Sequence, residues 1–286
     1  KAEVIKALGT DTATFHVRHI SPWSMSAQIA AKYRQGRVFL AGDAAHRFPP
    51  SGGLGLNTGA GDVHNLAWKL AHVIQGKAAP SLLDTYEQER RPVAQNNSTQ
   101  SLLNAAKMFD LIAALYGPDP EKAEDHFAEI CAAPDQAAVQ DGVNAQRPHF
   151  DSIRLQLGYR YASPELINAD NAEDTELDIS IYEPSYDVGA LLPHEWLNDT
   201  QSLKSVVALD RFTLIYGRDG QAWGAASNLL RTHPYHACWE EKTDLGNDGA
   251  LLIRPDGHIA ARYDHLAADP AARLAEDLSK ILGRSA

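Results

Sequence analysis

Cysteine and long apolar runs are scarce in this sequence of 286 residues. The two cysteines, Cys131 and Cys238, lie far apart, so neither a disulfide framework nor a cysteine-rich metal site is indicated. No apolar run approaches the roughly 20 residues needed to span a bilayer, which argues against an integral membrane protein. We therefore expect a cytoplasmic protein, because free thiols are typical of a reducing compartment.

Positive charge is scarce as well, with 26 Lys and Arg residues against 37 Asp and Glu residues and a formal net charge of -11. An acidic chain without a basic run is poorly suited to phosphate backbones, so nucleic acid is not an expected partner. The 12 histidines show no HExxH or comparable spacing, and we expect no metal site. A content of 44% hydrophobic and 22% charged residues is typical of a globular protein with one large domain or two smaller ones.

The first 57 residues predict short elements and a long loop. Residues 12–20 are rich in β-branched and aromatic side chains and predict a strand. Residues 28–33 indicate a short helical turn. Residues 37–43, with the sequence RVFLAGD, predict a buried strand that carries Asp43 at its C-terminal end. The prolines and glycines of the following loop, residues 46–57, exclude regular structure.

Apolar spacings of three and four predict three helices in the next region. The first begins at Thr58 and stops at Gly76, the second begins at Ser81 and is kinked or ended by Pro92, and the third ends at Gly117. On the first helix, the residues that we expect on the buried face are Ala60, Val63, Ala67, Leu70 and Ile74. The acidic, alanine-rich stretch that follows favours a further helix over residues 121–133.

After about Leu177 the pattern changes to short strands and turns. A strand run at residues 205–217 precedes a helical stretch near Trp223 to Arg231. Two more strands flank Pro255-Asp256-Gly257 and predict a hairpin with Asp-Gly as its turn, and a helix over residues 271–282 closes the chain. The order strand, helix, hairpin, helix is that of a thioredoxin-like module.

Chemistry concentrates in residues 36–71, GRVFLAGDAAHRFPPSGGLGLNTGAGDVHNLAWKLA. The carboxylate of Asp43, at the end of a strand, could accept hydrogen bonds from the hydroxyls of a polyol such as a ribityl chain. Pro49 and Pro50 make a rigid corner without N–H groups, which we expect to leave carbonyl oxygens free to point into a pocket.

Three glycines after this corner, Gly52, Gly53 and Gly55, allow the backbone to approach a flat ligand without obstruction by Cβ atoms. Asn57 and Thr58 then stand at the predicted start of a helix, where unpaired N–H groups and the positive end of the helix dipole favour negative charge. Reduced flavin carries its charge near N1 and the C2 carbonyl, so this geometry suits a redox flavin better than a phosphate.

The motifs GDAAH, PP, GLN and YEQERRP stand in an order that is similar to the second FAD-binding motif of the class A flavoprotein monooxygenases. This family includes para-hydroxybenzoate hydroxylase and the phenol, chlorophenol and hydroxyphenylpropionate hydroxylases, and SPW before GRVFLAGDAAH resembles the phenol and chlorophenol branch. The resemblance implies FAD as cofactor, NAD(P)H as co-substrate, and hydroxylation of a small phenolic substrate with O2. The candidate cofactor-binding residues are Gly42, Asp43, Pro50, Gly53, Leu54, Gly55, Leu56 and Asn57.

By this resemblance, Asp43 binds the ribityl hydroxyls and Pro50 presents its carbonyl near the flavin and the substrate hydroxyl. Gly55, Leu56 and Asn57 would line the pyrimidine side of the ring. No residue is assigned as a catalytic acid or base. The identity of the phenol and the choice between NADH and NADPH stay open.

The resemblance also implies an α/β fold in two parts. Residues 1–150 would be the C-terminal half of a para-hydroxybenzoate hydroxylase-like FAD-binding domain with long helices, and residues 151–286 a thioredoxin-like C-terminal domain without redox cysteines. The GxGxxG fingerprint that places the FAD pyrophosphate on a helix N-terminus is missing. We therefore expect a C-terminal fragment that binds FAD poorly or not at all by itself.

Several interpretations stay side by side. His46 could be a base, although a structural or flavin-packing role is favoured; Trp23 could touch substrate, although a core position is favoured. Arg90-Arg91 could brace the helix or contact a partner subunit, or could lie on a solvated face. For the protein as a whole, the rivals are a non-catalytic interaction module that dimerises through its thioredoxin-like part, and a flavin oxygenase acting on polyketide-like substrates.

Overall fold

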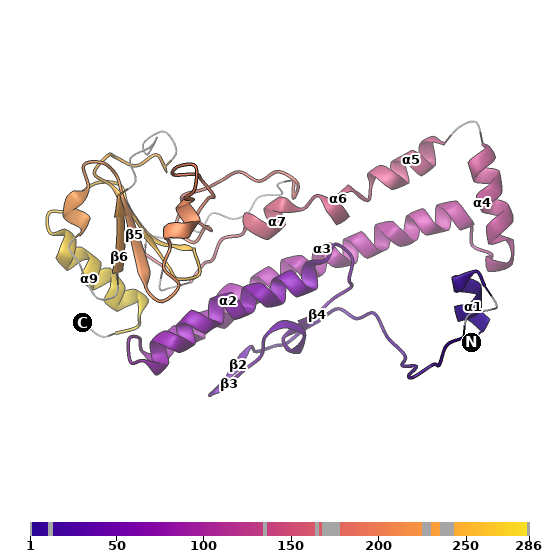
Figure 1. The fold of residues 1–286 in the computed structure, drawn as a ribbon, viewed down its shortest axis with the longest axis horizontal. Helices are drawn as coiled ribbons and strands as arrows, with labels where there is room; N and C mark the ends of the chain where they lie inside the picture. Colours follow the sequence, from indigo (N-terminus) through magenta and orange to yellow (C-terminus); the bar gives the residue numbers. More distant parts are fainter. Residues whose placement is uncertain are drawn as a thin grey trace.

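The computed structural model describes residues 2–10, 14–133, 136–163, 166–167, 178–224, 230–234 and 243–284. Two long helices form the centre of the molecule, and a C-terminal module with a four-stranded sheet lies at one end of them (Figure 1). Short strands lie along the other side of the helix pair. Cys238 lies outside the described residues, and so do residues 225–229 of the helical stretch predicted from Trp223 to Arg231. In the described part of that stretch the prediction is wrong, because Trp223 lies in a short 3-10 turn and Leu230 and Arg231 lie in a strand.

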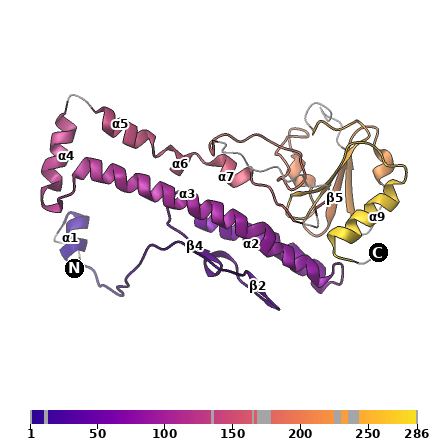
Figure 2. The ribbon, with the colours of Figure 1, turned by 180° about the vertical axis from the view of Figure 1, so that it is seen from behind.

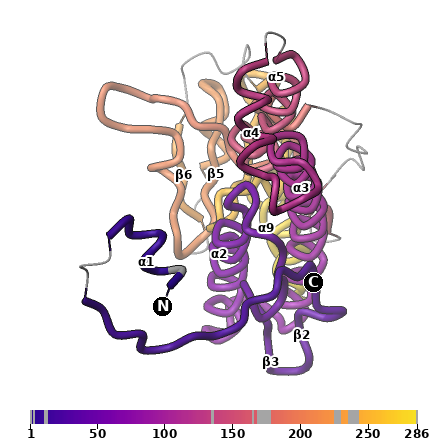
Figure 3. The backbone as a smooth tube through the Cα atoms, turned by 90° about the vertical axis from the view of Figure 1, so that its right-hand side faces the viewer, coloured from indigo at the N-terminus to yellow at the C-terminus, as the bar shows by residue number. Residues whose placement is uncertain are grey.

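In the N-terminal region, the described residues form one helix, α1 (Ala2–Leu8), and four two-residue strands. The strands are β1 (Gln28–Ile29), β2 (Arg34–Gln35), β3 (Val38–Phe39) and β4 (His46–Arg47). β1 pairs with β4 and β2 pairs with β3, both antiparallel. Viewed along the long axis, α1 and the segment after it stand away from the helix pair (Figure 3).

Four of the predictions for this region are wrong. Residues 46–57, where no regular structure is predicted, contain β4 and, from Leu54, the start of the next helix. Residues 14–20 form no strand, and residues 28–33 begin with β1 instead of forming a helical turn. The buried strand predicted over residues 37–43 is reduced to β3, where the side chain of Val38 is 66% exposed, and Asp43 lies in a short 3-10 helix, Gly42–Ala44. A strand needs a partner along its whole length, and the pairing described here is confined to local two-residue ladders.

The helix α2 (Leu54–Ile74) begins four residues before its predicted start. Gly53 adopts the left-handed conformation just before it, with φ 65°, and Gly76 does so after its end, with φ 69°. The predicted stop at Gly76 is thus confirmed. Because glycine carries no Cβ, both positions reach this conformation without steric cost.

The second and third predicted helices are one helix, α3 (Thr85–Tyr116), which follows a 3-10 turn at Pro80–Asp84 and runs through Pro92. An interior proline removes one hydrogen bond and costs about 3 kcal/mol. The neighbouring residues Glu89, Arg90 and Val93 are buried in contacts that hold the backbone on both sides of this point. Tertiary packing therefore overrides the local signal. The predicted end at Gly117 is confirmed.

Four shorter helices lead back along α3 towards the C-terminal module (Figures 1 and 2). They are α4 (Ala123–Ala132), α5 (Ala137–Asn144), α6 (Arg147–Phe150) and α7 (Ile153–Leu157). The helix predicted over residues 121–133 corresponds to α4 and the 3-10 turn Pro120–Lys122 before it. None of the described helices is long and apolar enough to cross a membrane.

The described part of the C-terminal module contains a mixed four-stranded sheet in the order β6-β5-β7-β8. Its strands are β5 (Phe212–Tyr216), β6 (Leu230–Pro234), β7 (Ala250–Ile253) and β8 (Ile259–Tyr263). β5 runs parallel to β6 and antiparallel to β7, and β7 and β8 form the predicted hairpin around Asp256-Gly257. The closing helix is α9 (Pro270–Ile281), capped by the side chain of Asp269.

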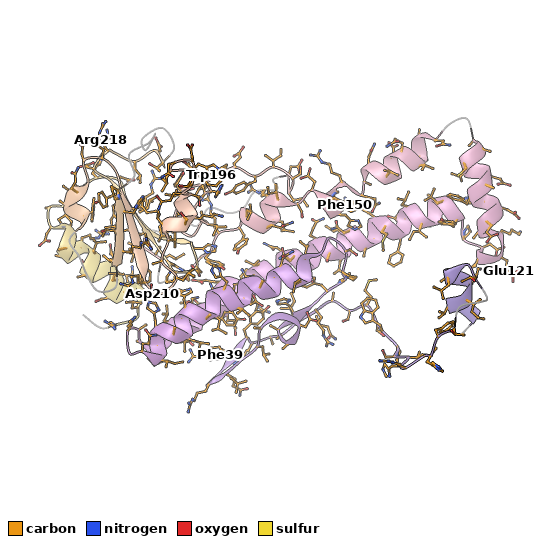
Figure 4. All side chains as sticks on the ribbon, in the orientation of Figure 1. Phe39, Glu121, Phe150, Trp196, Asp210 and Arg218 are labelled. Atoms are coloured by element: carbon orange, nitrogen blue, oxygen red, sulfur yellow. The ribbon has the colours of Figure 1, made fainter. Side chains whose placement is uncertain are left out.

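One hydrophobic core joins this module to the helix pair. Trp68 of α2 and Val93 of α3 belong to the same buried cluster as the strands β5, β7 and β8. The ring of Trp68 meets the ring of Phe212 edge to face, with centroids 5.7 Å apart. Figure 4 places Trp196 and Arg218 on the module and Phe39 on the opposite side of the helix pair. The helices thus hold the module on one side and the short strands on the other.

Candidate active site

A cleft of about 550 Å³ opens between the residues before β1, the turn around β4 and the start of α2. The residues that surround it include Trp23, Gln28, Asp43, His46, Phe48, Pro50 and Gly55. Two separate segments of the chain, residues 22–28 and 43–55, therefore meet at one place. The wall combines aromatic rings, one carboxylate and backbone near a helix start.

Three of the eight candidate residues line this cleft: Asp43, Pro50 and Gly55. The carboxylate of Asp43 is exposed and makes no hydrogen bond to the other described residues, so both oxygens are able to accept donors from a ligand. A Cβ atom on Gly55 would come only within 3.9 Å of the Phe48 ring. These three residues give the cleft an acceptor and a bare stretch of backbone.

The other five candidates stand beside the cleft without lining it. Gly42 has φ 57° and its N–H donates to Oδ2 of Asp62 at 3.1 Å. Gly53 precedes α2, and Leu54 is buried. Leu56 is 85% exposed, and the Asn57 amide donates to the Gly53 carbonyl at 3.0 Å. The contacts of Leu56 and Asn57 with a flavin therefore stay predictions.

The prediction that the carbonyl oxygens of Pro49 and Pro50 are free is wrong. Ser101 donates its hydroxyl to the Pro49 carbonyl at 2.7 Å, and the Gly53 N–H donates to the Pro50 carbonyl at 3.1 Å. Each carbonyl already has one donor because this corner is tied to α3 and to the start of α2. Pro50 still lines the cleft, with the second lone pair of its carbonyl available.

His46 is buried at the inner wall of the cleft. Its Nε2 lies 2.8 Å from Oδ2 of Asp62, and its ring stacks on Phe48 with centroids 5.4 Å apart. Since the carboxylate only accepts, Nε2 is the donor. Nδ1 has no hydrogen-bond partner among the described residues. This geometry supports the structural interpretation of His46, because Asp62 fixes its ring.

Trp23 does not lie in the core, so the favoured interpretation of this residue is wrong. Its side chain is 71% exposed and lines the cleft. The segment before β1 packs against no sheet in the described part of the chain, so the ring is left at the surface. Trp23 is therefore available to a ligand in the cleft.

Sequence reasoning missed Asp62, which lies directly behind the cleft and next to Arg90. Oδ2 of Asp62 accepts from Gly42 and His46, and its Oδ1 accepts from Nε of Arg90 at 2.9 Å. Arg90 also donates to the Thr58 carbonyl and to the Tyr161 hydroxyl, both at 3.1 Å. The interpretation of Arg90 as a brace fits this structure, and a solvated face does not, because Arg90 is buried.

The buried side of α2 is not the predicted apolar face: besides Leu54, Leu66 and Trp68 it contains mostly polar residues. The apolar residues Val63 and Ile74 are 58% and 81% exposed. The buried polar residues at helical spacing are Thr58, Asp62, Asn65, Lys69 and His72. This polar stripe was the signal in the sequence that could have located Asp62, but it becomes a buried face only because α3 and the β7–β8 hairpin supply complementary groups.

A second buried cluster lies farther along the same helices. Glu89 accepts from Lys69 at 2.7 Å and from both terminal nitrogens of Arg254 at 2.6 and 2.9 Å, and Trp68 donates to Asp256 at 3.0 Å. Burial alone would raise the pKa of Glu89, but the charges of Arg254 and Lys69 lower it to about 2. Burial lowers the pKa of Lys69 to about 8 despite Glu89.

Five donor contacts converge on the Glu89 carboxylate and stabilise its charged form. With a pKa of about 2 for Glu89 and about 8 for Lys69, both partners are charged at neutral pH. No group of three or more His, Cys, Asp or Glu side chains with the geometry of a metal site occurs within the described ranges.

Two protein families match the chain. Residues 1–101 match the FAD binding domain family, and residues 185–285 match the family described as aromatic-ring hydroxylase, C-terminal. The matched ranges contain the cleft and the four-stranded sheet, respectively.

Curated relatives match nearly the whole chain. Tetracenomycin B2 monooxygenase-dioxygenase of Streptomyces olivaceus is 35% identical over 99% of this chain and 50% of the relative. The 2,4-dichlorophenol 6-monooxygenase of Cupriavidus pinatubonensis is 30% identical over 97% of the chain and 52% of the relative. Phenol 2-monooxygenase of a Pseudomonas species is 30% identical over 95% and 50%. The chain thus spans about half the length of the curated relatives it matches.

Solved structures have a similar fold. The flavin-dependent monooxygenase PieE, in complex with FAD and substrate, aligns with a TM-score of 0.84 and 29% identity over 99% of this chain and 54% of that one. A ternary complex of aklavinone-11 hydroxylase with FAD and aklavinone aligns with a TM-score of 0.72 and 30% identity over 99% and 50%. Together with the two family matches, these similarities show that the chain belongs to the FAD-dependent aromatic-ring hydroxylases.

Proposed function

We propose that this chain supplies the flavin-facing half of the active site of an FAD-dependent monooxygenase that hydroxylates a phenolic ring with NAD(P)H and O2. The observation that carries the proposal is the shared cleft of Asp43, Pro50 and Gly55 at the start of α2. When bound, FAD would supply the redox chemistry for this reaction, with NAD(P)H and O2 as co-substrates.

The residues present fit the isoalloxazine and ribityl parts of FAD. The unpaired carboxylate of Asp43 suits the ribityl hydroxyls. The N-terminus of α2 suits the negative charge near N1 and the C2 carbonyl of the flavin, because its cap residue, Gly53, has no side chain that could accept from the first N–H groups. The residues do not supply a pyrophosphate site, since GxGxxG is absent from the sequence. We therefore propose that the intact protein contains a dinucleotide-binding fold in addition to these residues.

The exposed apolar stripe of α2 supports that addition. Val63 and Ile74 are largely exposed on a helix that is otherwise part of the central pair. We propose that the additional dinucleotide-binding fold covers this face of α2.

The protein's share of the reaction is positioning and exclusion of water. Trp23, Phe48 and the stacked His46 form aromatic walls on which a flat ring could lie. Burial between such walls keeps water from the reacting atoms and holds the phenol close to the flavin. We propose that the C-terminal module, whose strand order is compatible with a thioredoxin-like fold, braces this site and does not perform redox chemistry itself.

The relatives are named both for phenols and for tetracenomycins. Our proposal is a phenolic ring, and turnover of phenols of increasing size by the intact protein tests the extent of the substrate. An intact protein that is purified gently without flavin, or that consumes no NAD(P)H in response to any phenol, would contradict the proposal. The interaction-module alternative predicts this flavin-free result.

Asp43 provides the residue-level test. We expect Asp43→Ala in the intact protein to weaken FAD binding about ten- to hundred-fold, because ribityl hydroxyls lose a charged acceptor worth about 1.5–3 kcal/mol. Asp141→Asn is the matched control, since Asp141 is an exposed carboxylate on α5 outside the cleft. Flavin fluorescence during titration with FAD measures both. Equal affinity in the two variants would remove Asp43 from the site.

A further inference from the structure

We propose that Arg90 is a positioning residue through which the C-terminal module holds the turn at Gly42 and Asp43. The module acts through the hydroxyl of Tyr161, and Arg90 acts through Asp62. This gives the module an influence on the candidate flavin site although it does not line the cleft. The inference rests on the proposed function for its meaning, but the coupling itself is a property of this chain.

The first step is the hold on the turn. Asp62 Oδ2 accepts from the Gly42 N–H at 3.1 Å and lies 2.8 Å from His46 Nε2, so one oxygen atom fastens both ends of the segment that carries Asp43. Gly42 has φ 57° and packs so closely on α2 that a Cβ on Gly59 would lie 3.1 Å from its Cα. A movement of Asp62 would therefore move the turn.

The second step is the position of Asp62 itself. Its other oxygen, Oδ1, accepts from Arg90 Nε at 2.9 Å, and both side chains are almost fully buried. The remaining nitrogens of Arg90 donate to the Thr58 carbonyl and to the Tyr161 hydroxyl. A planar guanidinium whose three nitrogens all donate hydrogen bonds is held in one orientation. Arg90 therefore fixes the positions of α2, α3 and Tyr161 relative to one another.

The third step is the anchoring of the module on the same turn of α3. Glu89, the neighbour of Arg90, takes both terminal nitrogens of Arg254 from the β7–β8 hairpin, and Arg254 lies over the Tyr161 ring at 5.1 Å. Two consecutive residues of α3 thus carry contacts to the module, and one of them continues to the cleft. A shift of the module would reach Asp62 through Arg90.

The test is amide hydrogen exchange in this chain. Tyr161→Phe removes only the hydroxyl that Arg90 uses. The matched control is Tyr263→Phe, which removes another buried tyrosine hydroxyl of the same module, bonded to Asp277 at 2.8 Å and without contact to Arg90. We expect exchange of the Gly42 amide to rise about three- to ten-fold in Tyr161→Phe, the loss of about one ordinary hydrogen bond, and to stay unchanged in Tyr263→Phe.

The amide of Leu40, which donates to the Tyr33 carbonyl at 2.9 Å, serves as the internal reference. A merely structural role of Tyr161 would speed exchange at Leu40 and Gly42 alike, and that result, like unchanged exchange at Gly42, would overturn the inference. In the intact protein, Tyr161→Phe should also release FAD faster than Tyr263→Phe does. Selective exchange at Gly42 in a protein that binds no FAD would refute the proposed function and support the coupling.

Discussion

Replacing Glu89 with glutamine should destabilise the protein strongly. The carboxylate is almost fully buried and receives donors from Asn65, Lys69, Ser163 and, twice, Arg254. Glu89→Gln keeps the shape, removes the charge and points an N–H2 group at these donors. Removing one partner of a buried ion pair leaves an uncompensated charge and costs about 3–5 kcal/mol. We expect a loss in that range for Glu89→Gln.

Urea unfolding followed by circular dichroism measures this loss, with an unchanged slope as the sign that the native state stays compact. Asp151→Asn is the matched control because it breaks the exposed Arg147–Asp151 pair, which is worth about 0.3–0.5 kcal/mol. If the reasoning is right, Lys69→Met should recover part of the loss when added to Glu89→Gln. A cost below about 1 kcal/mol for Glu89→Gln, or no recovery in the double variant, would refute it.

Two further predictions concern pH and packing. Burial lowers the pKa of His258 below its ordinary 6.5, so the unfolded chain binds a proton that the folded chain rejects. The free energy of unfolding should therefore fall as pH drops from 7 to about 5, and urea titrations of His258→Gln should lack this part of the fall. Gly61→Ala should cost about 1–3 kcal/mol, because its Cβ would lie 2.6 Å from Arg90 Nη2 in a side chain that cannot retreat without losing its partners. Gly55→Ala, with no atom nearer than 3.9 Å, should cost nothing or stabilise α2, and equal effects in thermal unfolding would contradict this explanation.

The sequence predicted best where one residue determines local backbone geometry. Gly76 and Gly117 end their helices, and Asp256-Gly257 turns the hairpin, because few other residues reach these conformations without strain. Pro92 misled because its cost of about 3 kcal/mol is local, whereas the buried contacts of α3 on both sides are tertiary. Local sequence rules fail where tertiary packing stabilises an element by more free energy than the local residue costs it.

The candidate site divides in the same way. Asp43, Pro50 and Gly55 could be found because their residue types have direct uses beside a flat polyol-bearing ligand, and the structure brings them to one cleft. Asp62 could not be found, because a polar residue on a helix is usually solvated, and for Arg90 a bracing role was only one of several interpretations. Only the fold shows that the two residues meet each other.

The buried polar residues of α2 contribute more to the specificity of helix packing than to the stability of the fold. Its ionic partners balance, since Asp62, Glu89 and Asp256 stand against Lys69, Arg90 and Arg254. Apolar residues of similar volume would often stabilise such an interface as well or better, but they would tolerate sliding of one helix on another. The paired guanidinium groups accept one register only. The carboxylate of Asp43 lies on a turn that is hydrogen-bonded to this face of α2. Its position therefore depends on a single helix register more than on additional stability.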